Sequence, residues 1–308
     1  MTGMSALLNS LAVIITYMLI GYLLCRIGMI TDRNRQSFID FVIKVTLPCM
    51  VFKSFLGDMT AQMLRDGAAV LAISSGVCLF AWIVGPFVFP KGPDTKRSIM
   101  KFALLVGNIG FVGLPLVTDT FGEAGSFYGS FYLISNVVFN WSVGIAFLSP
   151  GLKGKDLIKK VLLNPGIIGV VLGVGRMLLR IPLPQTAVTV VTALGSMTGP
   201  MGIILIGAIL AGCDPRSVFE KDVLYTTFMK LVALPLCLFA FKVLTRSVLP
   251  LDDAAWGVLM VLTAMPAGAT TAILAENYGQ DHLFASKVTF ATTVFSLVTV
   301  PLAAMFLC

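Results

Sequence analysis

The chain has 308 residues, of which 57% are hydrophobic and only 12% are charged, and its mean hydropathy is +0.94. Soluble globular proteins carry roughly 25% charged residues, so this composition excludes a soluble protein and indicates one embedded in a membrane. The net charge of +7 would suit an acidic partner, but the basic residues are distributed as topology signals, so nucleic-acid binding is not expected.

Apolar windows long enough to cross a bilayer, about 20 residues as a helix, recur along the whole chain. They are continuous, whereas the strands of a transmembrane barrel alternate apolar and polar residues. The connections between them are short and leave no room for a soluble domain. We therefore predict an all-α integral membrane protein with ten transmembrane helices, at 5–25, 36–56, 66–89, 98–119, 125–148, 160–180, 186–211, 218–244, 254–276 and 283–307.

Basic residues are concentrated in every second connection. The loops after the odd-numbered helices, with the adjoining helix ends, hold 14 of the 22 Lys and Arg residues, and the opposite loops hold six. Cytoplasmic loops carry such an excess. We therefore place these loops in the cytoplasm and both termini on the other side, and we expect a bacterial inner (plasma) membrane.

The residue types that most enzymes and metal sites need are scarce. His282 is the only histidine, the six cysteines show no CxxC spacing, and Asp40 is the one carboxylate that we place inside a span. No GxxxxGK[ST] motif occurs, so the chain itself is not expected to hydrolyse ATP. We expect neither an enzyme nor a bound metal or cofactor, with H⁺ or Na⁺ as the candidate coupling ions.

Prolines suggest an internal repeat. Four prolines of the first half each have a counterpart 149–152 residues later, which pairs Pro48 with Pro200, Pro86 with Pro235, Pro115 with Pro266 and Pro150 with Pro301. A five-helix unit that is repeated enters the membrane from the opposite side. We therefore predict two inverted repeats, 1–150 and 151–308, an organisation typical of secondary transporters that bind substrate at discontinuous helices near the midplane.

Two apolar segments, GNIGFVGLPL (107–116) and AMPAGATTAILAENYG (264–279), contain residues that disfavour helix. Glycine costs about 1 kcal/mol and proline about 3 kcal/mol in a helix interior. Ordinary proline kinks are one explanation. The other is a pair of interrupted helices, which membranes tolerate where the backbone is buried in protein or lines a wet cavity. On that interpretation the site residues are Gly107, Gly110, Gly113, Pro115, Pro266, Gly268, Thr270 and Thr271.

GNIGFVGLPL resembles the Asn-x-x-x-x-Gly-[Leu/Ile]-Pro-Leu signature in the fourth helix of the auxin efflux carrier family, whose bacterial members include malonate-transporter-like permeases. TLPCMVFKSF (46–55), NPGIIGVVLGV (164–174) and MPAGATTAILAENYGQD (265–281) resemble further segments of the family in the same order. The resemblance implies ten helices in two inverted repeats, an architecture related to that of bile-acid/sodium symporters. Helices 4 and 9 would be broken and cross at Pro115 and Pro266, with Asn108 in contact with the substrate.

Two departures from the plant members limit what the resemblance implies. Plant carriers have a long hydrophilic loop between the repeats, whereas residues 149–160 form a loop of only twelve residues. Where plant members have Pro-Gln-Gly in helix 9, this chain has Pro266-Ala267-Gly268. The loss of that amide favours a small bacterial-type organic acid over auxin.

Other polar residues inside the predicted spans have two interpretations each. Asn136 and Asn140 share a helix face and line a pathway or join two helices. For Lys230 the two interpretations are that it offsets the charge of an anionic substrate or that it bonds carbonyl groups freed by a broken helix. Asp40 and Lys44, four residues apart, form a proton or ion relay or a static structural pair.

These features favour a secondary-type carrier for a small carboxylate, since the amino termini of broken helices suit an anion. We expect helices 3–5 and 8–10 to move against a scaffold of helices 1, 2, 6 and 7 by alternating access. The alternatives are a sodium-coupled symporter similar to the bile-acid/sodium symporters and, less favoured, a passive anion channel. The lipid bilayer and a homodimer through the scaffold helices are the expected partners besides the substrate.

Overall fold

The computed structural model describes residues 2–57, 60–149, 155, 158–159, 162–212, 219–268 and 270–307. The regular elements of these residues are helical, and helix covers each of the ten predicted segments. Five continuous helices are long and apolar enough to cross a membrane: Ala61–Val88, Ile109–Leu148, Gln185–Ile209, Lys221–Thr245 and His282–Ala304. The prediction of an all-α protein with apolar, membrane-spanning helices is confirmed for the described chain.

The first half of the chain contains α1 (Thr2–Arg26), α2 (Asp32–Phe41), η1 (Val42–Thr46), α3 (Leu47–Lys53), α4 (Ala61–Val88), α5 (Asp94–Leu105), η2 (Ile109–Gly113), α6 (Leu114–Phe139), η3 (Asn140–Gly144) and α7 (Ile145–Leu148). The segments labelled η are π-helical. Gly122 divides α6 into two helices, because its φ of 64° and ψ of −142° are not helical. Glycine takes a positive φ without the steric cost that a Cβ atom imposes.

The second half contains α9 (Pro165–Leu179), α10 (Gln185–Ser196), α11 (Thr198–Leu210), α12 (Lys221–Phe228), η5 (Met229–Ala233), α13 (Leu234–Thr245), α14 (Asp253–Thr263), α15 (Thr270–Asn277) and α16 (His282–Leu307). The start of α9 is capped by Asn164, whose Oδ1 accepts a 2.9 Å hydrogen bond from the amide of Gly166. Pro165 occupies the first helical turn, where a missing N–H is harmless.

Three of the π-helical segments in the described chain directly precede a Leu-Pro pair. These pairs are Leu47-Pro48 after η1, Leu114-Pro115 after η2 and Leu234-Pro235 after η5. Proline lacks an N–H, so the carbonyl group one turn earlier loses its partner. The widened turn absorbs this loss, and the helix continues past the proline.

Only one of the two interruptions contains the proline that the repeat pattern assigned to it. The first is at residues 106–108, between α5 and η2, while Pro115 lies in the first turn of α6. The second lies between α14 and α15 and includes Pro266. The residues that meet, Gly107 and Ala267, are 160 positions apart, not 151. The expectation that Pro115 and Pro266 mark the crossing is thus corrected: Pro266 belongs to an interruption and Pro115 does not.

The helices pack as two groups. In the first, α1 packs on α11, and α3 packs on α9 and α10. In the second, α4 packs on α5, α6 and α14, while α16 packs on α12, α14 and α15. A small residue allows close approach within the first group, since a Cβ atom at Gly169 would lie 2.7 Å from the carbonyl oxygen of Pro48.

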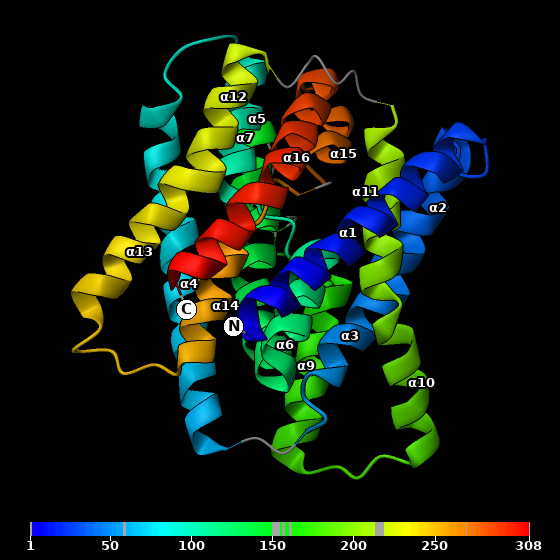
Figure 1. Ribbon diagram of the computed structural model, residues 1–308, viewed down its shortest axis with the longest axis vertical. Coiled ribbons are helices and arrows are strands. Elements are labelled where there is room, and N and C mark those ends of the chain that lie inside the picture. The colour runs from blue at the N-terminus through cyan, green and yellow to red at the C-terminus, as the bar shows by residue number, and fades with distance from the viewer. Residues whose placement is uncertain are drawn as a thin grey trace.

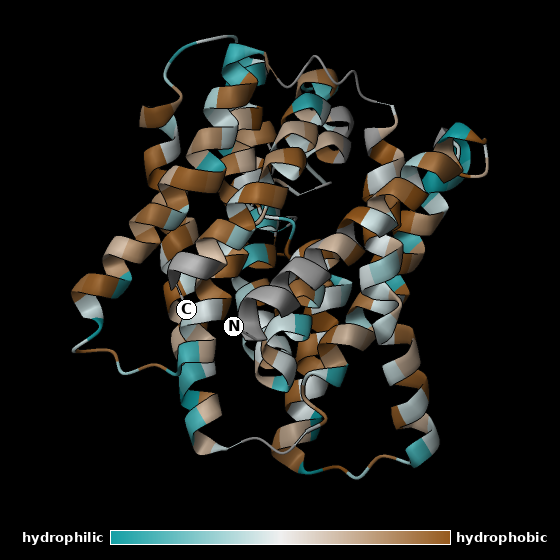
Figure 2. Ribbon diagram, in the orientation of Figure 1, coloured by the Kyte–Doolittle hydropathy of each residue, from teal (hydrophilic) through white to brown (hydrophobic). Residues whose placement is uncertain are grey.

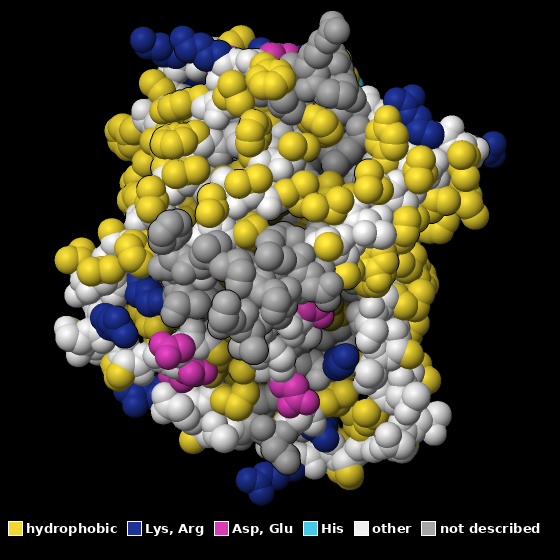
Figure 3. All heavy atoms as spheres, in the orientation of Figure 1, with side chains coloured by type: hydrophobic (Ala, Val, Ile, Leu, Met, Phe, Trp, Pro, Cys, Tyr) yellow, Lys and Arg dark blue, Asp and Glu magenta, His cyan; other side chains and the backbone are white. Residues whose placement is uncertain are grey.

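Connections that the sequence analysis assigns to opposite sides of the membrane lie toward opposite ends of the molecule. In Figure 1 the connection from α4 to α5 and the start of α16 lie at the upper end, and the connections α9–α10 and α13–α14 lie at the lower end. Hydrophobic residues predominate along the helices between the two ends (Figure 2). On the visible face, hydrophobic side chains cover much of the surface and several Lys and Arg side chains gather at its upper left margin (Figure 3).

Candidate functional site

The two interruptions bind each other through their backbones. The amide of Asn108 donates a 2.8 Å hydrogen bond to the carbonyl oxygen of Pro266, and the amide of Gly268 donates a 3.3 Å bond to Val106. Gly107 and Ala267 consequently form an isolated antiparallel β-bridge. We call this paired backbone, residues 106–108 and 266–268, the crossing. Each interrupted strand supplies the hydrogen bonds that the other lost with its helix, which satisfies polar groups that hydrocarbon could not.

A third segment, from α16, completes the crossing. The amide of Ala267 donates a 3.2 Å hydrogen bond to Thr292 Oγ1, which in turn donates to the carbonyl oxygen of Val288. Thr292 is fully buried. The sequence analysis missed this residue, since a threonine that bonds its own helix and one that serves another segment look alike in sequence.

A small cavity of about 100 Å³ lies beside the crossing. Seven predicted site residues line it: Gly107, Asn108, Gly110, Asn136, Asn140, Gly268 and Thr270. Trp141 and Asn164 also line it and were not predicted as site residues. None of the described residues in its wall carries a charge, so four asparagines, an indole and peptide groups define its chemistry.

Two of these asparagines hold unused hydrogen-bonding groups. Asn108 and Asn140 are 4% and 7% exposed. Asn108 Nδ2 and Asn140 Oδ1 have no hydrogen-bond partner among the described residues. A buried polar atom without a partner costs about 1–3 kcal/mol. Two residues that line one cavity thus have an unused donor and an unused acceptor, a combination that suits a polar occupant.

The remaining predicted site residues lie outside this cavity. Gly113 packs against Leu262, and a Cβ atom there would lie 2.8 Å from Leu262 Cδ2. Pro115 lines the larger cavity described below, and Pro266 lines a small apolar recess on α16. Thr271 is fully buried and its Oγ1 has no partner among the described residues.

Lys230 contacts the backbone next to the crossing and does not line the cavity beside it. Its side chain is 2% exposed, and its Nζ donates a 3.0 Å hydrogen bond to the carbonyl oxygen of Leu104. Of the two roles considered from sequence, the structure therefore shows a bond to a carbonyl group near the end of a broken helix.

The predicted pair of Asp40 and Lys44 forms, with 2.6 Å between Asp40 Oδ2 and Lys44 Nζ. The Lys44 and Asp40 side chains are 64% and 41% exposed, and neither lines a described cavity. The buried carboxylate is instead Asp66, which is 1% exposed and accepts two hydrogen bonds from Gln62 Nε2. The expectation that Asp40 is the one carboxylate inside a span missed Asp66, which lies in the long apolar helix Ala61–Val88.

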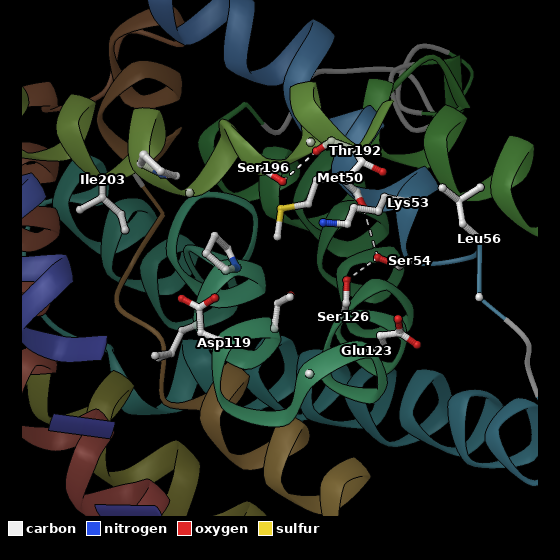
Figure 4. A pocket seen from close by; sticks show the side chains of 18 of the residues that line it. Met50, Lys53, Ser54, Leu56, Asp119, Glu123, Ser126, Thr192, Ser196 and Ile203 are labelled. Atoms are coloured by element: carbon white, nitrogen blue, oxygen red, sulfur yellow. Dashed lines mark hydrogen bonds between the residues drawn. The ribbon is translucent and has the colours of Figure 1, made fainter. Parts of the chain in front are cut away.

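A second cavity, of about 780 Å³, lies between the two helix groups. We call it the vestibule. Its walls come from α1, α3, α10 and α11 on one side and from the Gly122 turn of α6 on the other. Figure 4 shows Lys53 of α3 on one wall and Asp119 and Glu123 of α6 on the other. A 2.6 Å hydrogen bond between Ser54 Oγ and Ser126 Oγ links the walls.

Apolar helices packed around a paired interruption, with a small asparagine-lined cavity beside it, are the architecture expected of a membrane transport protein. Comparison with known families agrees, since the membrane transport protein family matches residues 6–304. The chain belongs to this family, the auxin efflux carrier family. The resemblance found in the sequence is thereby confirmed.

Relatives in archaea and bacteria are similar along nearly their whole length. An uncharacterized transporter of Methanocaldococcus jannaschii, MJ1031, is 23% identical over 94% of this chain and 95% of the relative. An uncharacterized transporter of Methanothermobacter thermautotrophicus is 24% identical over 94% of each chain. The uncharacterized transporter YfdV of Escherichia coli K12 is 22% identical over 96% of each chain. The class, a membrane transporter, follows from the family and these relatives.

Proposed function

We propose that this protein is a secondary transporter that carries a small organic anion across the membrane by alternating access, with the anion bound beside the crossing. The observation that carries the proposal is the small cavity beside the paired interruptions, which is lined by Asn108, a residue whose Nδ2 is a donor without a partner among the described residues. A carboxylate oxygen is an acceptor that would use this donor.

Two helix amino termini beside the cavity would stabilise a bound anion. The helix formed by η2 and α6 begins directly after Asn108, and α15 begins at Thr270, so two helix amino termini adjoin the cavity. Such termini carry a partial positive charge and exposed N–H groups. An anion would thus be stabilised without an arginine in the wall.

The size of the cavity limits the substrate. Pockets for drug-sized ligands span about 300–1,000 Å³, whereas this cavity measures about 100 Å³. The proposed substrate is therefore a short carboxylic acid of a few heavy atoms. Auxin-like acids with a fused aromatic ring would need a larger cavity than the one present.

Alternating access is supported by the position of both cavities between the two helix groups. The vestibule lies between α3, α10 and α11 of one group and α6 of the other. The cavity at the crossing likewise has Ile43 and Leu47 on one wall and the crossing, η2, α6 and η3 on the other. We propose that the group containing the crossing moves against the other within a ten-helix architecture of two inverted repeats, which alternately opens the site to each side.

Counterflow in proteoliposomes tests the proposal. Vesicles holding purified protein are loaded with unlabelled acetate, L-lactate or malonate and diluted into a trace of the same labelled acid. A carrier gives a transient accumulation of label above its equilibrium level, and protein-free vesicles do not. Accumulation only with Na⁺ would favour the sodium-coupled alternative, and a large conductance without counterflow would favour a channel. No saturable flux of any of the three acids would overturn the proposal.

A further inference from the structure

Lys230 places a positive charge directly against the crossing. Its Nζ is 3.0 Å from Leu104 O, and a Cβ atom built on Gly107 would lie 3.7 Å from the same Nζ. Lys230 forms no ion pair with any carboxylate of the described residues. The ammonium group is therefore held by a backbone carbonyl group next to the crossing and not by a carboxylate of the described residues.

The interruption explains why an ammonium group is stable there. In an unbroken helix the amide of Asn108 would bond the carbonyl oxygen of Leu104, but it donates to Pro266 instead. Leu104 O is thus free to accept from Lys230 Nζ. The carboxyl-terminal end of α5 also carries a partial negative charge, which favours a cation at this position. These contacts hold the ammonium in place, but no carboxylate of the described residues pairs with its unit charge.

Asp66 does not neutralise Lys230. It lies in the second turn of α4 and forms no ion pair with Lys230, and both of its oxygens accept hydrogen bonds from Gln62 Nε2. Among the described residues, Asp66 and Lys230 have the only buried side chains that carry a formal charge. Of these two buried charges, Lys230 therefore lies at the crossing and Asp66 lies in α4.

Lys230 also belongs to the helix group that contains the crossing. The segment η5 packs on α5, α12, α13 and α16. When this group moves across the membrane field, the charge of Lys230 moves with it.

We propose, resting on the transport function above, that Lys230 is the fixed counter-charge of a monocarboxylate and makes the protein an anion exchanger. With a monoanion bound, the moving group carries Lys230⁺ and one carboxylate, and the pair is neutral. Without substrate it carries an uncompensated positive charge, which is costly to move through a low-dielectric region. Both steps of an exchange use the loaded, neutral group, whereas net transport requires the empty group to return.

Exchange and net uptake of acetate, L-lactate and malonate are compared in the same proteoliposomes. For a transported monoanion we expect exchange to be at least about tenfold faster than net uptake, because only net uptake moves an uncompensated charge. A potential that is negative inside, set with K⁺ and valinomycin, should slow net uptake further, since it opposes outward return of the positive empty group. It should leave the exchange rate unchanged.

Variants assign the effect to the charge. Lys230→Met keeps an unbranched side chain without charge, and we expect its ratio of exchange to net uptake to fall to near one. Lys230→Arg keeps the charge and should keep the ratio above one. Each variant is checked for a monodisperse elution profile and a cooperative thermal transition, and should Lys230→Met fail this check, the wild-type response to potential and the Lys230→Arg ratio still decide.

The outcomes separate this inference from the function on which it rests. Saturable transport with equal rates of exchange and net uptake would overturn the exchanger and leave the transporter standing. Transport of malonate alone would also overturn it, because a dianion leaves the loaded group charged. Absence of saturable flux for all three acids would overturn both.

Discussion

The amide of Asn108 donates a 2.8 Å hydrogen bond to the carbonyl oxygen of Pro266, which lies 158 residues later in the chain. This bond joins the two interruptions and fixes the backbone of Asn108 with φ −79° and ψ 61°. Because the backbone is held by the partner segment, the side chain needs no role in the fold. Its Nδ2 atom is buried and has no partner among the described residues, so a ligand that bonded it would displace no hydrogen bond of the described fold.

Asn108→Ala should weaken binding of the transported acid without destabilising the protein. A hydrogen bond to a charged group contributes about 1.5–3 kcal/mol, so we expect about 10- to 150-fold weaker binding. The variant removes no bond of Nδ2, and the thermal midpoint should stay close to that of the wild type. Isothermal titration with the best acid of the counterflow panel measures the affinity, and a melt in detergent measures the stability.

Asn34→Ala is the control with the opposite expectation. Asn34 Oδ1 accepts a 2.7 Å bond from the Thr31 amide in the capping box of α2, outside both cavities. Loss of a cap costs about 1 kcal/mol, so its melting temperature should fall while its affinity stays unchanged. Equal affinities of the Asn108→Ala variant and the wild type would remove Asn108 from the site.

Thr292→Val should destabilise the crossing. The two side chains have nearly the same shape, but valine cannot accept the 3.2 Å bond from the Ala267 amide. A buried N–H left without a partner costs about 1–3 kcal/mol. Thr289→Val is the matched control on the same helix, because Thr289 is 3% exposed and its Oγ1 has no partner among the described residues. Thermal melts should show a loss for the first variant only, and a larger loss for Thr289→Val would contradict the assignment.

The sequence predicted the interrupted segments because glycine and proline are costly in a helix, and this physical signal is local. It misplaced Pro115, because a proline that follows a π-helical turn fits into a continuing helix. The spacing of the prolines therefore reflected Leu-Pro pairs at widened turns as much as the interruptions themselves. The contact between Gly107 and Ala267 depends on tertiary structure and could not be read from either segment alone.

The polar residues of the site were predicted unequally for a related reason. Asn108 was implied by the resemblance to the auxin efflux carrier family, whereas Asn136 and Asn140 were recognised because an amide inside an apolar span is costly unless it has a function or a partner. Asn164 was missed as a site residue, although its position before Pro165 is a helix-capping signal, because capping alone explains an asparagine there. Whether Lys230 faces a carbonyl group or a cavity depends on helix rotation, which the sequence of η5 does not determine.

Gly169→Ala and Gly175→Ala should change stability in opposite directions, although both lie in α9. A Cβ atom at Gly169 would lie 2.7 Å from Pro48 O, and overpacking of this kind costs about 1–3 kcal/mol. A Cβ atom at Gly175 would meet nothing within 4 Å, and alanine is favoured over glycine in a helix by about 1 kcal/mol. Melts of both variants check this, and a stable Gly169→Ala protein would contradict the tight packing of α3 on α9.

The vestibule gives a direct test of the orientation inferred from basic loops. Ser196 is exposed and lines the vestibule, while Lys91 is exposed in the connection from α4 to α5, which we place in the cytoplasm. In a chain whose six cysteines are replaced by serine or alanine, Ser196→Cys should react with a membrane-impermeant maleimide in intact cells. Lys91→Cys should react only after the membrane is permeabilised. The predicted topology rests on the excess of Lys and Arg in cytoplasmic loops. The reverse labelling pattern would therefore contradict it. In a third outcome, neither cysteine reacts in intact cells but both react after permeabilisation. The vestibule is then closed to the outside in the membrane. In that case a saturating concentration of the transported acid should change the labelling rate of Ser196→Cys alone.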